Sequence, residues 1–480
     1  MTTTKTLSHY IDGRWEAAAP SFDSLNPSDT RDVVARVPSD DGSGIAAAVK
    51  AAKAAFPAWS AASSEVRSDV LDRAGNTILA RMDELARLMS REEGKTVPES
   101  RAEVNRTGRI FKFFAGEALR SRGDTVDSTR AGVETATYRE PVGVFGLITP
   151  WNFPLAIPAW KSAPALCFGN TVVMKPSELT PALAVALAEI LHEAGIPRGV
   201  FNLVLGAGAA GGALSAHPDV DGISFTGSQG TGARVAAAAL SHQARFQLEM
   251  GGKNPLVVLD DCDLERAVEC ALDGAFFSTG QRCTASSRLI VTAGIHDRFV
   301  DALAARVAAL RVGDALSPET QMGPVASQAQ LDKAVSYIKI ATGEGGVCRT
   351  GGCVLELDKP GYYISPTLIT GTDSRMRINN EEVFGPVASV IQVRDYDEAL
   401  AVANAGEFGL SAGIITTSLK HARHYTRNVR AGMVMVNLPT AGVDYHIPFG
   451  GSRKSSYGPR EQGFAAIEFY TQLKTSYSWS

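Results

Sequence analysis

The sequence lacks the features that mark several specialised classes of protein. Its first residues, MTTTKTLSHYIDGRW, show neither an unbroken apolar run nor a small-residue cleavage site, so they do not resemble a secretory signal. Six cysteines are spread over 480 residues, and none stands in paired C-x-x-C motifs or near a histidine cluster. This spacing provides no zinc-ligand motif, and reduced thiols fit it better than a disulfide framework. We therefore expect a cytoplasmic protein with reduced thiols and no metal.

The chain also lacks a large excess of charge of one sign. The chain has 47 basic and 51 acidic residues, mixed throughout, and a net charge of -4. No basic stripe is present to neutralise a nucleic-acid backbone, so nucleic acid is excluded as a partner. The longest apolar stretch, from Val142 to Trp160, is interrupted by Pro150, Pro154 and Pro158. These prolines favour a buried strand followed by a loop over a membrane span.

The pattern of apolar residues predicts an α/β protein. Residues 44–58 and 64–91 have apolar residues at three- and four-residue intervals, which indicates helices packed on the surface. From Val142 onward, short apolar runs alternate with helical segments, which is typical of parallel sheets. The same texture resumes after residue 254, so we expect two parallel-sheet α/β domains with a boundary near residues 251–252. The predicted strands have the sequences VGVFGLIT, NTVVMKP, VFNLVLG, GISFTG, NPLVVLD, SRLIVTA, ASVIQV and SAGIITT.

Cys283 lies in the segment STGQRCTASS, which is rich in glycine and small polar residues. One interpretation is that this cysteine is a small buried core residue. The flanking residues favour another interpretation, because they pack poorly in a core but can present backbone N–H groups to a developing oxyanion. A catalytic thiol needs a base or positive charge nearby, since a free thiol is mostly protonated at neutral pH.

Two further polar residues have plain alternatives when each is taken alone. Glu249 in QLEMGGKNP is consistent with a solvated strand end, and Asn152 in ITPWNFP with an ordinary turn residue. Together with Cys283 they provide a nucleophile, a base and an amide donor. That set is what the oxidation of an aldehyde through a covalent intermediate requires.

Seven short motifs carry a resemblance to a known family. TPWNFP, KPSE, FTGS, EMGGKNP, GQRC, EEVFGP and PFGG occur in this order between Thr149 and Gly451. In content and order they resemble the aldehyde dehydrogenase superfamily. The stretch VNLPTAGVDYHIPFGG, followed by SSYGPREQG, is most similar to bacterial α-ketoglutaric semialdehyde (2,5-dioxopentanoate) dehydrogenases. The resemblance implies oxidation of an aldehyde, with α-ketoglutaric semialdehyde as a candidate substrate; another semialdehyde, or an aromatic or aliphatic aldehyde, stays an alternative.

The resemblance implies a role for each of the three polar residues. Cys283 matches the nucleophile that forms a thiohemiacetal with the aldehyde, and the Asn152 amide with the Cys283 backbone N–H would hold the oxyanion. Hydride transfer to a nicotinamide would leave a thioester. Glu249 would then take a proton from the water that hydrolyses this thioester.

One glycine motif matches a dinucleotide-binding fingerprint without the sequence context that this fingerprint requires. Gly206, Gly208 and Gly211 match the dinucleotide fingerprint G-x-G-x-x-G, but the next strand ends in Thr-Gly where a ribose-binding acid should stand. We therefore interpret this turn as a device for helix–strand packing. The resemblance instead places the adenosine ribose at Lys175 and Glu178 and implies that NAD is preferred, with NADP as an alternative; a helix cap is the other interpretation of that segment.

The resemblance assigns further residues to the cofactor and the substrate. Ser228 would lie at the pyrophosphate, because a helix N-terminus suits an anion, and Glu382 and Phe384 would lie at the nicotinamide. The remaining predicted cofactor residues are Trp151 and Gly227. The predicted substrate residues are Phe153, Trp160, Phe277 and Arg282. Core packing is the alternative for the three aromatic residues, while Arg282 is either the partner of a distal substrate carboxylate or part of a surface salt bridge.

The resemblance also implies a domain plan and an assembly. An NAD(P)-binding domain is expected over residues 1–121 and 140–251, and a catalytic domain carrying Cys283 over 252–450. An oligomerisation flap is expected over 122–139 and 467–480, which implies a homodimer or homotetramer. Three other functions are disfavoured by the sequence. Glu249 argues against a CoA-acylating dehydrogenase, and the absence of a histidine motif argues against a cysteine hydrolase. The presence of both Cys283 and Glu249 argues against a non-catalytic binding protein.

Overall fold

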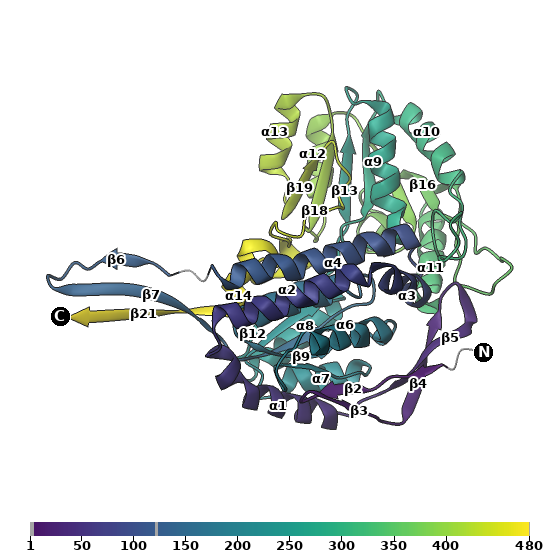
Figure 1. Ribbon diagram of the computed structural model, residues 1–480. Helices are drawn as coiled ribbons and strands as arrows, with labels where there is room; N and C mark the ends of the chain where they lie inside the picture. The colour runs from purple at the N-terminus through teal and green to yellow at the C-terminus, as the bar shows by residue number, and fades with distance from the viewer. Residues whose placement is uncertain (1–3, 121–122, 480) are drawn as a thin grey trace.

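The computed structural model describes residues 4–120 and 123–479 of the chain. Two large sheets, each flanked by helices, dominate it, and a narrow arm of strands projects from one side (Figure 1). The mixed α/β fold with parallel sheets that the sequence predicts is confirmed. No helix within the described ranges is long and apolar enough to cross a membrane.

The first sheet has eight strands in the order β20-β12-β11-β8-β9-β10-β2-β3. Its central strands, from β12 to β10, run parallel, while β20, β2 and β3 are antiparallel additions at the edges. Because the strand order reverses between β8 and β11, a ligand is expected at the carboxyl ends of these strands. The strands are β2 (His9–Ile11), β3 (Arg14–Glu16), β8 (Val144–Ile148), β9 (Thr171–Lys175), β10 (Phe201–Leu203), β11 (Gly222–Thr226), β12 (Arg245–Glu249) and β20 (Ser456–Tyr457).

The second sheet has seven strands in the order β15-β16-β17-β14-β13-β18-β19. All neighbours in it are parallel except β15 and β16. Its inner strands are almost fully buried, as expected for a parallel sheet covered on both faces. The strands are β13 (Asn254–Val258), β14 (Ser286–Thr292), β15 (Val347–Thr350), β16 (Thr367–Thr372), β17 (Val387–Val393), β18 (Ser411–Ile415) and β19 (Met433–Val436).

Helices cover both sheets, and α2 and α4 lie along one side of the first sheet (Figure 1). The helices over the first sheet are α1 (Ser43–Ser60), α2 (Ser64–Ala80), α3 (Met82–Glu93), α4 (Val97–Ala118), α5 (Ala156–Cys167), α6 (Pro181–Glu193), α7 (Gly208–Ala216), α8 (Gln229–Leu240) and α14 (Ile467–Tyr470). Those over the second sheet are α9 (Leu264–Phe276), α10 (His296–Ala308), α11 (Gln328–Gly343), α12 (Tyr396–Asn404) and α13 (Leu419–Asn428).

The arm is a third sheet made of β6 (Thr125–Asp127), β7 (Val133–Pro141) and β21 (Thr471–Trp479). Strand β21 pairs with β7 along its whole length, so the end of the chain is joined to a segment more than 300 residues earlier (Figure 1). A small fourth sheet contains β1 (Lys5–Thr6), β4 (Pro20–Asn26) and β5 (Asp29–Pro38).

All eight strands predicted from apolar runs are present. The strands of the first sheet lie between residues 9 and 249, apart from β20, and those of the second between 254 and 436. This segregation is compatible with the predicted domain plan, which stays a prediction, and positions 1–3, 121, 122 and 480 of that plan lie outside the described residues. Strand β12 is not among these eight apolar runs, because its sequence RFQLE is partly polar. It ends at Glu249, in agreement with the interpretation of this residue as a strand end, but the residue is buried and not solvated.

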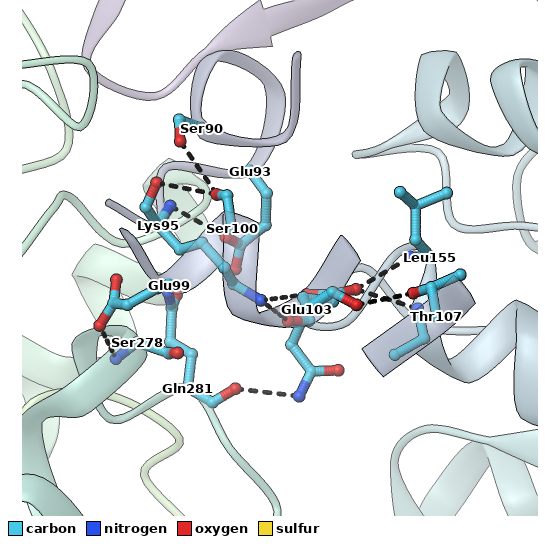
Figure 2. A network of polar contacts seen from close by, with 12 residues as sticks. Ser90, Glu93, Lys95, Glu99, Ser100, Glu103, Thr107, Leu155, Ser278 and Gln281 are labelled. Carbon is cyan, nitrogen blue, oxygen red and sulfur yellow. Dashed lines mark hydrogen bonds and ion pairs between the residues drawn. The ribbon is translucent and has the colours of Figure 1, made fainter. Parts of the chain in front are cut away.

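A buried group of charges joins α4 to the loop that follows β8 (Figure 2). Lys95 Nζ lies 2.6 Å from Glu103 Oε2, and both side chains are 1% exposed. The same ammonium donates to the backbone carbonyl of Asn152 at 2.7 Å. Glu103 Oε1 accepts from the backbone N–H groups of Leu155 and Ala156, both at 3.0 Å, and so caps the N-terminus of α5.

A second carboxylate extends this group toward the other sheet. Glu99 Oε1 accepts from the backbone N–H of Ser278 at 2.6 Å (Figure 2). Its other oxygen closes the capping box of α4 with Thr96. Burial raises the pKa of the neighbouring Glu93 to about 8, so this carboxyl is mostly protonated at neutral pH. One helix therefore positions loops from both halves of the molecule.

We predict that Lys95→Met strongly lowers thermal stability. Removing one partner of a buried ion pair leaves Glu103 charged and unpaired, which typically costs about 3–5 kcal/mol. The matched control is Lys112→Met on α4, the helix that carries Glu103, since the Lys112–Asp72 ion pair is partly exposed and such pairs are worth about 0–1 kcal/mol. The midpoint of thermal unfolding measures both, and equal shifts in the two variants would contradict the prediction.

Candidate active site

Cys283 lies in a strained loop between α9 and β14. Ser278 and Thr279 both have left-handed backbone conformations, with φ of 50° and 55°. Such conformations are costly for residues other than glycine and persist only where the surroundings enforce them. Here the Glu99 carboxylate holds the Ser278 N–H, and the Cys283 carbonyl accepts from Asn254 Nδ2 at 2.7 Å. The loop is thus fixed on both sides of the thiol.

The electrostatic surroundings of Cys283 keep its thiol protonated in the resting protein. Burial is the largest cause, and the negative charges of Glu249 and Glu382 add to it, so that the pKa of the thiol rises to about 12. Arg106 acts in the opposite direction. Attack by this sulfur therefore requires a group that accepts its proton.

Glu249 stands at the carboxyl end of β12, in the first sheet. Its Oε2 accepts a hydrogen bond from Ser456 Oγ at 2.5 Å. Burial and the nearby charge of Glu461 raise its pKa well above the usual range. A Cβ on Gly450, where φ is 145°, would lie 2.8 Å from Glu249 Oε1, so glycine in the PFGG motif leaves space for this carboxyl group.

Behind Glu249 lies a buried ion pair that the sequence analysis missed. The Lys161 ammonium contacts Glu461, and the two side chains are 0% and 2% exposed. Lys161 also donates to Ser224 Oγ at 2.8 Å. The lysine stands on the apolar helix α5, and a charged residue within such a buried helix is the one sequence signal that points to this pair.

Asn152 is brought to the Cys283 loop by a direct contact. Its side-chain Nδ2 donates to the carbonyl of Gln281 at 2.9 Å, and its own carbonyl is held by Lys95. The amide group carries two N–H donors, of which this bond uses one. The structure therefore joins the three predicted catalytic residues: Asn152 contacts the loop of Cys283, and Glu249 and Cys283 interact through their charges.

The predicted adenosine residues lie at the carboxyl end of β9. Lys175 is buried, and this burial lowers its pKa. Its Nζ makes a 3.3 Å contact with the Gly206 carbonyl and lies 3.8 Å from Glu178 Oε2. The Glu178 side chain is 48% exposed, so it faces solvent beside Lys175. The α6 helix begins after Glu178, at Pro181, and its N-cap Thr180 makes no side-chain cap bond.

The glycine turn before α7 only partly supports the packing interpretation. A Cβ on Gly206 would lie 3.0 Å from Ala210 Cβ and 3.2 Å from the Asp40 nitrogen, so this position is tightly packed. A Cβ on Gly208, in contrast, would meet nothing within 4 Å. At Gly211 it would make ordinary contacts with the Lys175 side chain. The turn therefore borders an open space beside Lys175.

The remaining predicted cofactor residues fall into two groups. Ser228 is the N-cap of α8, where its hydroxyl accepts from Thr231 N–H at 3.4 Å, and Gly227 precedes it after β11. Glu382 accepts from Gly252 N–H at 2.7 Å, and Phe384, with φ of 61°, packs edge-on against Trp151 at 5.5 Å. The first group belongs to the first sheet, whereas the second group joins the two sheets near Cys283.

The predicted aromatic substrate residues have different surroundings. The Phe153 ring lies 4.0 Å from Lys95 Nζ, and Trp160 stacks on Phe449 at 5.5 Å. Phe277 is 37% exposed. Phe449 packs in one apolar cluster with Cys283.

Arg282 has surroundings that the sequence analysis did not foresee. Its guanidinium lies 4.8 Å from the Phe277 ring centroid and donates to the carbonyls of Asp273 and Gly274, near the end of α9. The residue is buried and forms no ion pair with any carboxylate of the described chain. This geometry is neither a surface salt bridge nor an open carboxylate site. It favours a positioning role, because a cation is stabilised by the carbonyls at a helix C-terminus.

Comparison with known proteins places this site in context. The family description "Aldehyde dehydrogenase family" matches residues 15–476. An alpha-ketoglutaric semialdehyde dehydrogenase of Bacillus subtilis is 42% identical over 99% of this chain and 98% of its own length. A betaine aldehyde dehydrogenase of Mesorhizobium japonicum is 41% identical over 98% of this chain and 97% of its own. The crystal structure of a betaine aldehyde dehydrogenase from Staphylococcus aureus in complex with NAD+ is similar with a TM-score of 0.96 at 36% identity, covering 98% of this chain and 95% of that chain.

Proposed function

The chain belongs to the aldehyde dehydrogenase family and oxidises an aldehyde with NAD(P), and on this premise we propose that Cys283 is its nucleophile, Glu249 its base and Asn152 its oxyanion donor. The observation that carries the proposal is the meeting of Cys283 and Glu249. Glu249 ends a strand of the first sheet and Cys283 lies in a loop before a strand of the second; the surroundings of each raise its pKa. Such perturbed pairs in a buried site are typical of catalysis.

The first step joins the thiol to the aldehyde carbon. The Cys283 proton leaves to solvent as the C–S bond forms, so that Glu249 stays free to accept a proton from water in the later step. The carbonyl oxygen becomes an oxyanion. The second N–H of the Asn152 amide and the Cys283 backbone N–H would stabilise it, each such donor typically contributing about 2.7–4 kcal/mol.

The second half of the reaction releases the acid. Bound NAD(P) supplies the hydride acceptor, and loss of hydride from the thiohemiacetal carbon leaves a thioester on Cys283. Glu249 then takes a proton from water, whose oxygen attacks the thioester carbonyl. The C–S bond breaks, the carboxylic acid leaves, and the sulfur regains a proton.

The residues present fit a dinucleotide, and NAD is the proposed cofactor. Lys175 is a buried cation with only one long hydrogen bond, and Thr226 Oγ1, before Gly227 and Ser228, is buried with no acceptor or donor among the described residues. Both lie at carboxyl ends of strands on either side of the sheet's switch point. Lys175 and Glu178 would hold the adenosine ribose, Gly227 and Ser228 the pyrophosphate, and Trp151, Glu382 and Phe384 the nicotinamide end.

The relatives differ in the charge of the aldehyde for which they are named. Those with similar identities are named for an anionic aldehyde in one case and for a cationic one, betaine aldehyde, in the other. We propose an acidic semialdehyde, with α-ketoglutaric semialdehyde as the candidate. The names of further relatives support it: an archaeal alpha-ketoglutarate semialdehyde dehydrogenase and a 2,5-dioxopentanoate dehydrogenase are 42% and 38% identical to this chain.

A pre-steady-state experiment tests the assigned catalytic roles. In Glu249→Gln, hydride transfer should still produce a burst of NADH when enzyme, NAD and aldehyde are mixed, while steady turnover collapses because water is no longer activated. In Cys283→Ala, no burst and no turnover should occur, although NAD still binds. Stopped-flow absorbance and NAD titration measure these quantities. Full turnover in either variant would contradict the mechanism.

The cofactor assignment makes its own prediction. In Glu178→Thr, loss of a carboxylate beside the ribose should relieve repulsion of a 2′-phosphate and remove hydrogen bonds to NAD, which are worth about 1.5–3 kcal/mol when charged. The NAD/NADP ratio of kcat/KM should therefore fall by about tenfold or more. Glu193→Thr, the same charge change at the exposed end of α6, is the control. An unchanged ratio in Glu178→Thr would remove this residue from the cofactor site.

We also propose that the arm is an interface between copies of this chain. It is a short sheet with an exposed edge and large exposed side chains, and such features mark association surfaces. The exposed apolar residues on it are Val126, Tyr138, Leu473, Tyr477 and Trp479. A homodimer or a homotetramer follows from this proposal.

Light scattering at micromolar concentration tests the role of the arm. The wild-type protein should have two or four times the chain mass of 50.7 kDa. Leu473→Asp should shift it toward a single chain, because a buried charge without a partner destabilises the interface. Leu240→Asp, on the equally exposed surface of α8, is the control. A monomeric wild-type protein would overturn the proposal.

A further inference from the structure

Arg106 on α4 is a cation without a counter-charge. Its Nη2 donates to Gln462 Oε1 at 2.9 Å, and its guanidinium carbon lies 5.5 Å from the centroid of the Trp160 ring. The charges of Glu103 and Asp444 act on it, but no carboxylate in residues 4–120 and 123–479 lies within ion-pair distance. A guanidinium in such surroundings is costly unless a ligand completes it.

Three buried N–H donors meet at this point without an acceptor. They are Arg106 Nε, Trp160 Nε1 and Gln462 Nε2, none of which has a hydrogen-bond partner in the described chain. Buried polar groups are normally paired, so isolated exceptions need an explanation. Here the side chains lie in direct contact with one another, which makes the site a cluster of donors rather than three separate defects.

An aromatic path joins this cluster to the reactive sulfur. Trp160 stacks on Phe449 with ring planes inclined by 30°, and Phe449 packs in the apolar cluster that Cys283 touches. The positive charge of Arg106 also lowers the pKa of the Cys283 thiol, so the two groups interact across this path. Arg106 itself is half-buried, so its guanidinium is not sealed within the core.

The chemistry of the cluster selects among substrates. A cationic aldehyde would be repelled by Arg106, and the indole face that could bind it by a cation–π contact already lies against the guanidinium. A neutral alkyl tail would leave the donors unpaired. A carboxylate provides two acceptor oxygens, and a 2-oxo group beside it provides a third.

We propose that Arg106, with Trp160 and Gln462, binds the distal carboxylate of an ω-carboxylated aldehyde, and that a 2-oxo group next to this carboxylate occupies the remaining donor. This inference rests on the proposed function, because it takes Cys283 as the point at which the aldehyde reacts. It replaces Arg282 as the residue that recognises the acid, since the Arg282 guanidinium is held by the carbonyls of Asp273 and Gly274.

The test compares aldehydes of equal length that differ in the distal group. In Arg106→Leu, KM for succinic semialdehyde and for α-ketoglutaric semialdehyde should rise by about 10- to 100-fold, the range expected for loss of an Arg–carboxylate pair. The kcat/KM for butanal and pentanal should fall by a smaller factor, since an alkyl tail has no charge to lose and only the effect of Arg106 on the Cys283 thiol is removed. Arg106→Lys should recover part of the affinity for the acids. Arg109→Leu, an exposed arginine on the same helix, is the control.

Trp160→Phe separates the 2-oxo group from the carboxylate. The variant keeps the aromatic ring but loses the indole N–H, so KM should rise more for α-ketoglutaric semialdehyde than for succinic semialdehyde. Equal rises for the two would overturn the 2-oxo part of the inference.

A measurement without turnover completes the test. In the wild-type protein, 2-oxoglutarate should protect Cys283 from alkylation by iodoacetamide, and Arg106→Leu should abolish this protection. Equal loss of kcat/KM on acidic and neutral aldehydes, or protection that survives in Arg106→Leu, would overturn the inference. Failure of the proposed function is distinguishable, because it appears as activity or an NADH burst in Cys283→Ala, whatever residue stands at position 106.

Discussion

The buried Lys95–Glu103 ion pair is the contact on which the site depends. Its ammonium holds the backbone of Asn152, and its carboxylate caps α5, the helix that carries Trp160 and Lys161. The adjacent Glu99 on the same helix holds the strained Ser278 turn before Cys283. A charge pair removed from water has few alternative partners, so these contacts fix the loops of both sheets relative to one another.

The two large sheets use opposite ends to build the site. Asn152, Lys175, Ser228 and Glu249 follow the carboxyl ends of strands in the first sheet, whereas Cys283 and Glu382 precede the amino ends of strands in the second. The nucleophile and the base therefore stand on separate halves. Where these halves meet, desolvation raises the pKa of both groups; the charge of Glu461 raises that of Glu249 further, and the charge of Glu249 raises that of Cys283, so proton transfer becomes part of the chemistry.

Much of the fold was predictable because local patterns encode it. Apolar runs of five to eight residues predicted β8, β9, β13 and β14, since a strand covered on both faces must be apolar throughout. Strand β12 was not among the predicted apolar runs because its side chains are mixed in polarity. The burial of charged residues on α4 was not predicted for a related reason. Glu99 and Glu103 are four residues apart, a spacing that is typical of the solvated face of a helix, although such like charges repel on an open surface.

Arg106 and Arg282 separate what the sequence determines from what only the tertiary structure decides. The sequence by itself determined the family, the strand pattern and the candidate residues Cys283, Glu249 and Asn152, because motifs and periodicity are local properties of the chain. It could not decide which groups hold each guanidinium. Arg282, next to the nucleophile in sequence, folds back onto carbonyls near the end of the preceding helix α9, whereas Arg106, 177 residues before Cys283, contacts Trp160 and Gln462. Only the tertiary structure decided this, since a hydrogen bond depends on distances between segments that the chain separates.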